Sequence, residues 1–208
     1  MTSTLKATVH RALLGVLFGV LAGAALATPS GARQTVERFH ATLLGVMREA
    51  ATLGYAGRRA RLAPAVEASF DLSAISRLVL GRYWKGLDQA QRQRMIAAFT
   101  ALTVATYAAR FDGYSGERFK FVSERDLKRN RVLVRTVLIK QDGDKVRLDY
   151  VLHRTGKGWR FINVLADGVS EISIKRADYG AVMRGDGFEA LMTKLAAQTA
   201  HYAAEAVK

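Results

Sequence analysis

The chain has 208 residues, of which 50% are hydrophobic and 24% charged, which predicts a globular protein with its own core and excludes a long repeat array or a large multidomain enzyme. It contains no cysteine, which excludes disulfides, thiolate nucleophiles and cysteine-bound metal centres. Its 32 Lys and Arg residues against 18 Asp and Glu give a formal net charge of +14, which indicates an anionic partner such as nucleic acid, lipid head groups or an acidic membrane surface.

The first 27 residues have the three-part layout of a secretory signal peptide. Basic residues without acidic ones open the segment, an apolar stretch follows at 12–21, and small residues ending at Ala27 give a small-x-small cleavage site. Even extended to Ala27, the apolar stretch is shorter than the about 20 residues that cross a bilayer, so cleavage is favoured over an uncleaved membrane anchor. We therefore expect 1–27 to be a signal peptide and 28–208 to form one exported domain.

The first half of this domain and its last part have the apolar periodicity of helices. Apolar residues recur there at three- and four-residue steps. Pro64 is expected to break or restart one helix, Asp71 is a candidate N-cap, and Asp88 with Gln91 resembles a capping box. Gly81 suits a left-handed helix stop. The expected helices are 33–53, 58–69, 71–80, 88–111, 175–183 and 187–198.

Between the last two groups of helices the period of the pattern changes from near four to two. In 145–153 the even positions are all apolar and the odd ones mostly polar, which is typical of a half-buried antiparallel strand. The segment 131–140 is apolar on both faces, and 142–144 and 155–158 are turn signals. The expected strands are 119–122, 131–140, 145–153 and 159–165. We predict an α+β fold with helices on one face of a four-stranded antiparallel sheet.

The sequence lacks the patterns on which common catalytic and metal sites depend. His40, His153 and His201 are too far apart in the sequence for a local metal-binding motif. The segment 113–116 does not match the G-x-S-x-G nucleophile elbow, and no phosphate-binding glycine loop occurs. We therefore expect no enzyme activity, no metal and no cofactor.

Five short motifs together resemble one known family. They are Phe70-Asp71-Leu72, Leu80-Gly81-Arg82-Tyr83-Trp84, Thr106-Tyr107-Ala108-Ala109-Arg110-Phe111, Gly158-Trp159-Arg160-Phe161-Ile162-Asn163-Val164 and Gly168-Val169-Ser170. Their order and spacing resemble the periplasmic phospholipid-binding proteins of the toluene-tolerance family, the shuttle of the Mla lipid-asymmetry pathway, over about 33–197. The resemblance implies a twisted sheet covered by helices, with acyl chains held between the two layers. It also implies two partners, an inner-membrane ABC-type lipid transporter and an outer-membrane lipoprotein complex.

Candidate lipid-binding residues follow from this resemblance and from the alternating pattern of 145–153. Aromatic residues with a polar tip suit an apolar cavity that opens to water, and arginine forks suit phosphate, although an arginine on a strand is usually solvated or in an ion pair. The expected wall residues are Tyr83, Trp84, Phe99, Tyr107, Phe111, Val146, Leu148, Tyr150, Leu152, Val164 and Val169. The expected head-group residues are Arg82, Arg110, Arg135 and Arg147.

Three other interpretations stay open at the level of the sequence. Many family members have an aspartate where Asn163 stands, and the segments 166–171 and 175–179 resemble a branch associated with hopanoid biosynthesis, so the ligand could be a hopanoid. The net positive charge also leaves open a basic membrane-surface binder or a nucleic-acid-binding sheet, and the latter would need exposed aromatic residues, namely Phe119, Phe121, Tyr150 and Phe161. A lipid-ester hydrolase is disfavoured because the nucleophile elbow is missing.

Overall fold

The computed structural model describes residues 30–205. The signal peptide expected at 1–27 lies outside the described residues. Among the residues that are described, no helix is both long and apolar enough to cross a membrane. Within the same range, no three His, Asp or Glu side chains come together as a set that could hold a metal ion.

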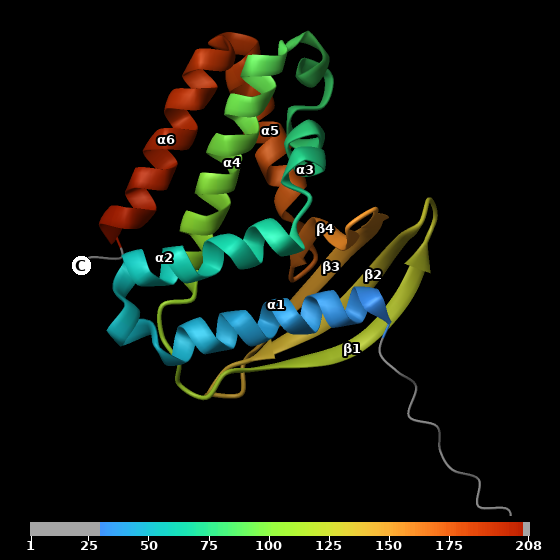
Figure 1. Ribbon diagram of the computed structural model, residues 1–208, viewed down its shortest axis with the longest axis vertical. Coiled ribbons are helices and arrows are strands. Elements are labelled where there is room, and N and C mark those ends of the chain that lie inside the picture. Colours follow the sequence, from blue (N-terminus) through green and yellow to red (C-terminus); the bar gives the residue numbers. More distant parts are fainter. Residues whose placement is uncertain (1–29, 206–208) are drawn as a thin grey trace, which may run out of the picture.

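Over residues 30–205 the chain folds as four α-helices, an antiparallel sheet and two final helices, so the expected α+β class is confirmed (Figure 1). The sheet has the strand order β1-β2-β3-β4-β5 with every pair antiparallel. It has five strands and not the expected four, because two residues after β4 pair back on it as β5. The elements are α1 (Gly31–Arg48), α2 (Ala50–Ser69), α3 (Leu72–Leu80), the 3-10 helix η1 (Gly81–Gly86), α4 (Gln89–Arg110), β1 (Arg118–Leu127), β2 (Arg131–Ile139), β3 (Lys145–Thr155), β4 (Gly158–Ala166), β5 (Val169–Ser170), α5 (Glu171–Gly185) and α6 (Gly187–Glu205).

The helices form two groups on one side of the sheet. Figure 1 shows α1 lying across the sheet, while α3, α4, α5 and α6 stand as an upright bundle at one end of it. An aromatic cluster joins the two layers, since the ring of Phe39 on α1 lies 5.4 Å from Phe70, 5.2 Å from Tyr107 and 5.5 Å from Phe161. The core therefore lies between the sheet and the helices, and both layers contribute buried apolar side chains to it.

The first two helices differ from the expected boundaries. The expected helix 33–53 is divided, because α1 ends at Arg48 and Gly54 adopts φ 55° and ψ −176° inside α2, a conformation that glycine reaches at little cost. The break expected at Pro64 is wrong, since α2 runs through this residue to Ser69. Leu62 and Val66 on either side of the proline are fully buried, so packing compensates for the lost backbone donor.

The helix caps read from the sequence are confirmed. The Asp71 carboxylate accepts a hydrogen bond from Ala74 N, and Asp88 and Gln91 form a reciprocal capping box at the start of α4. Gly81 ends α3 with φ 53°. These local polar contacts fix where α3 and α4 begin, and the two helices then position their apolar faces over the sheet.

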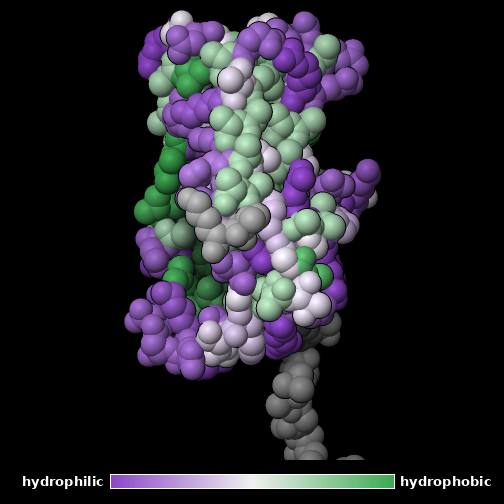
Figure 2. Space-filling model, turned by 90° about the vertical axis from the view of Figure 1, so that its left-hand side faces the viewer, coloured by the Kyte–Doolittle hydropathy of each residue, from purple (hydrophilic) through white to green (hydrophobic). Residues whose placement is uncertain are grey.

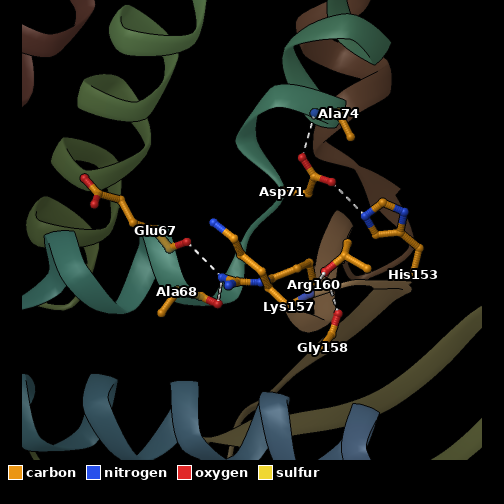
Figure 3. Close-up of polar contacts among 9 residues, drawn as sticks. Glu67, Ala68, Asp71, Ala74, His153, Lys157, Gly158 and Arg160 are labelled. Carbon is orange, nitrogen blue, oxygen red and sulfur yellow. Dashed lines mark hydrogen bonds and ion pairs between the residues drawn. The ribbon is translucent and has the colours of Figure 1, made fainter.

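The corner between α2 and α3 is tied to the sheet by side chains from β3 and β4 (Figure 3). The Arg160 guanidinium donates to the carbonyl oxygens of Glu67 and Ala68 at the end of α2. His153 Nε2 lies 2.9 Å from the second oxygen of the Asp71 carboxylate. Both contacts satisfy groups at helix ends and hold this corner against the edge of the sheet.

Candidate functional site

An apolar cavity of about 280 Å³ lies between the sheet and the helices. Residues from β2, β3 and β4 form one wall, and residues from α4, the start of α5 and the chain around α3 form the other. Its lining consists of Phe70, Ile75, Phe99, Thr103, Thr106, Tyr107, Arg110, Phe111, Leu138, Val146, Leu148, Tyr150, Asn163, Val164, Ala166, Glu171, Ile172 and Lys175. Large apolar and aromatic side chains thus face one another across a space that both layers enclose.

One lining residue of the cavity, Tyr150, is held in place by a buried histidine that lies outside the lining. The hydroxyl of Tyr150 lies 2.9 Å from Nε2 of His40, and the His40 ring stacks on Phe119. Burial lowers the pKa of His40 to about 3 and raises the pKa of Tyr150 well above its usual value. Both side chains are therefore neutral at physiological pH, so Tyr150 presents an uncharged surface to an apolar ligand.

The charged groups of the cavity gather where α4 ends and α5 begins. Arg110 Nη1 lies 3.4 Å from Glu171 Oε1, and Lys175 follows Glu171 by one helical turn. Burial lowers the pKa of Lys175, an effect that Arg110 reinforces and Glu171 opposes. The cavity is therefore apolar over most of its wall and charged at one side.

The cavity brings together a large part of the wall residues expected from the sequence. Phe99 and Tyr107 come from α4 and Phe111 directly follows it, so they share one helical side. Val146, Leu148 and Tyr150 alternate along β3 and all face the helices, as the period-two pattern predicts. The expected residues that line the cavity are Phe99, Tyr107, Phe111, Val146, Leu148, Tyr150 and Val164.

Four expected wall residues lie elsewhere. Tyr83 and Trp84 belong to η1, where Arg82 lies over the Tyr83 ring and Arg92 over the Trp84 ring. Leu152 continues the inward face of β3 but is fully buried in the core. Val169 is 55% exposed on β5, because this short edge strand turns the side chain toward solvent.

Of the four expected head-group arginines, Arg110 lines the cavity. Arg82 is placed at η1, against the Tyr83 ring. Arg135 and Arg147 occupy the outer face of the sheet, with their Nε atoms 3.6 Å and 3.9 Å from Asp149 Oδ2. Assigning these two to the cavity is wrong because Arg135 and Arg147 alternate along β2 and β3 with the residues that face the helices.

Several lining residues were not expected from the sequence. Glu171, Ile172 and Lys175 belong to the first turns of α5, which begins four residues before the expected helix because Ser170 caps it. Leu138 and Phe70 had visible signals, since the first lies in a strand that is apolar on both faces and the second opens one of the quoted motifs. Their inward direction is set by strand pairing and by the bridge between Phe70 and Phe161.

The sheet does not offer the exposed aromatic residues that nucleic acid binding needs. Tyr150 and Phe161 are 1% and 0% exposed, and Phe119 and Phe121 pack against the core. These four residues belong to or pack against the core, and Figure 1 shows helices covering one side of the sheet. The nucleic-acid-binding interpretation is therefore wrong for this sheet.

A different hollow lies on the helical side of the molecule, away from the sheet. It measures about 660 Å³ between α2 and α4, and alanines supply much of its wall. Figure 2 shows part of this side, where weakly hydrophobic residues in pale green follow the alanine-rich helix α6. Alanines together with Tyr55, Arg59 and Glu67 line this hollow, whereas the cavity over the sheet is lined mostly by large apolar side chains of both layers.

The sequence and the fold are both similar to those of known proteins. The chain is 26% identical over 121 residues to the intermembrane phospholipid transport system binding protein MlaC of Haemophilus influenzae, covering 56% of each chain. The match thus spans about half the length of that curated relative. The fold resembles that of a phospholipid-binding protein from Ralstonia solanacearum, solved with a phospholipid, at a TM-score of 0.75 and 18% identity, covering 84% of this chain and 99% of that one. The family model described as MlaC protein matches residues 37–197, so the chain belongs to the MlaC protein family.

Proposed function

We propose that this protein is a periplasmic carrier that shuttles phospholipid between membranes. The observation that carries the proposal is the cavity, whose apolar wall is built from both layers and whose charged residues gather at one side. This division matches a phospholipid, which has apolar chains and a charged head group. The names and ligand of the similar proteins support the same function.

The energetics of an acyl chain explain what such a cavity does. Transfer of a methylene group from water to an apolar site is worth about 0.8 kcal/mol, so bound chains do not escape into water. Transfer from a bilayer to the same site gains close to zero, because both environments are apolar. Loading and unloading are therefore directed by partners, which we propose are an inner-membrane ABC-type transporter and an outer-membrane lipoprotein complex.

A hopanoid is the second candidate ligand. Asn163, the residue that resembles the hopanoid-associated branch, lines the cavity and exchanges hydrogen bonds of 3.0 and 3.2 Å with Ser170. The Asn163 amide and the Ser170 hydroxyl could form hydrogen bonds with a polar group of a neutral ligand. The three charged residues beside them favour an anionic ligand, and for this reason we rank phospholipid first.

Lipid extraction and mass spectrometry of the purified exported protein test the proposal. We expect phospholipid bound inside the cavity, and an N-terminus near Thr28 where the signal peptide is removed. Bound lipid should persist as salt is raised, whereas sedimentation with anionic liposomes should weaken, since surface charges are screened over about 8 Å at physiological salt. If bound lipid is lost in parallel with liposome binding, the protein is a basic membrane-surface binder and the carrier proposal fails.

A further inference from the structure

Two cations and one carboxylate share the charged side of the cavity. Arg110 belongs to the last turn of α4, and Glu171 and Lys175 belong to the first two turns of α5. All three line the cavity. Together they carry one more positive than negative charge toward a space whose remaining wall is mostly apolar.

The single carboxylate of this group, Glu171, forms an ion pair with Arg110. Glu171 Oε1 lies 3.4 Å from Arg110 Nη1. Asp178, the next acidic residue of α5, binds Lys194 of α6. Among the described residues, no hydrogen bond or ion pair reaches the Lys175 ammonium group, although burial has removed part of its hydration. An ammonium in this setting lowers its free energy by binding an anion.

The start of α5 is held in place by polar contacts. The Ser170 hydroxyl accepts a hydrogen bond from Ser173 N at 3.2 Å and thereby caps the helix. The same hydroxyl exchanges hydrogen bonds with the Asn163 amide on β4. Because the cap is anchored to the sheet, Glu171 and Lys175 lie in fixed positions relative to the cavity wall, and an anion finds a prepared site.

We propose that Lys175 and Arg110 bind the phosphodiester of the lipid, with Glu171 holding Arg110 in position when the phosphate is absent. This inference rests on the proposed function and adds to it a selectivity among lipids. A phosphodiester carries one negative charge, which balances the excess positive charge of this group. Neutral lipids such as diacylglycerol or a hopanoid offer the Lys175 ammonium no phosphate, and among the described residues only Glu171 and Asp178 then attract it. The site therefore selects lipids that carry a phosphodiester over lipids of the same chain length that lack an anionic group.

Competitive loading tests this selectivity. The purified protein is stripped of lipid and offered equimolar dioleoyl phosphatidylglycerol and dioleoylglycerol in detergent, and the bound lipids are counted by mass spectrometry. Wild-type protein is expected to take up the phospholipid preferentially. Lys175→Met, which removes the charge and keeps the length of the side chain, should lower the ratio of bound phospholipid to diacylglycerol about tenfold.

Two further variants control the measurement. Lys157→Met changes a lysine in the exposed turn between β3 and β4 and should leave the ratio unchanged. Lys175→Arg keeps the charge and should retain most of the preference. Circular dichroism and thermal melting of each variant establish that the fold is kept.

The possible outcomes separate this inference from the proposed function. An unchanged ratio in folded Lys175→Met overturns the phosphate site while the carrier function stands. Wild-type protein that takes up neither lipid overturns both. In a third arm, oleate is added at the same concentration, and a preference for oleate over phosphatidylglycerol would assign the cations to a fatty-acid carboxylate and overturn the phosphodiester assignment.

Discussion

The two faces of strand β3 have opposite physical characters although they are built from alternate residues of one segment. On the inner face, Val146, Leu148 and Tyr150 line the cavity. On the outer face, Arg147 and Asp149 alternate with them, and Arg135 of the paired strand β2 joins this group. A period of two thus assigns one face to an apolar ligand and the other to ion pairs.

This comparison shows why residue type alone does not locate a binding site. The guanidinium groups of Arg110 and Arg147 are equally suited to phosphate. The Arg110 side chain extends from α4 into the cavity, whereas the Arg147 side chain extends from β3 on the opposite face of the sheet. The direction of the side chain, which the strand register sets, decides which arginine can meet a ligand inside the protein.

Loss of an inner-face aromatic residue should give the largest effect on stability. Phe161 is fully buried and contacts Phe39, Phe70 and Tyr150. We expect Phe161→Ala to lower the free energy of unfolding by about 4 kcal/mol, the range for large buried aromatics. Val151→Ala on the outer face should cost about 1 kcal/mol. Chemical denaturation measures both, and equal losses would contradict the distinction between the faces.

The outer-face ion pairs should show a smaller and non-additive effect. Asp149 is 6% exposed and lies between Arg135 and Arg147, which are each about half exposed. Removing either arginine should cost less than about 1 kcal/mol, since the other remains near the carboxylate. Removing both should cost about 2 kcal/mol, because a buried carboxylate then lacks a partner. Simple addition of the two single losses in a double-mutant cycle would show that the arginines act independently.

The inner face should also give the protein a pH dependence through His40. Burial lowers the pKa of His40 from 6.5 to about 3, so the unfolded chain binds a proton here at a pH where the folded protein does not. The contribution of neutral His40 to the free energy of unfolding is therefore fully present above pH 6.5 and is lost as the pH falls toward 3. Between pH 6.5 and 5 we expect a loss of about 1.5 kcal/mol, which His40→Gln should abolish in urea titrations. An equal pH dependence in the variant would assign the effect to other groups.

The sequence predicted those features that depend on local pattern. Helix caps at Asp71 and Asp88 and the alternation along β3 are visible in a few neighbouring residues, and the structure confirms them. It did not predict the passage of α2 through Pro64 or the pairing of β5, because buried neighbours and strand contacts decide these. Lys175 was missed as a lining residue for the same reason, since its position depends on how α5 packs against α4 and the sheet.

The most direct test of the account compares one charge placed on each face of β3. Leu148 and Val151 are both partly buried, but Leu148 lines the cavity and Val151 lies on the opposite face. Leu148 is preferred to Tyr150 as the test position because Tyr150→Asp would also remove the buried hydrogen bond to His40. In variants that keep their circular dichroism and cooperative melting, we expect Leu148→Asp to lower the bound phospholipid per protein several-fold, because an unpaired charge in an apolar cavity is unfavourable. Val151→Asp should leave the amount of bound phospholipid per protein unchanged. Normal lipid content in folded Leu148→Asp, or the same loss in both variants, would contradict the assignment of the cavity as the lipid site.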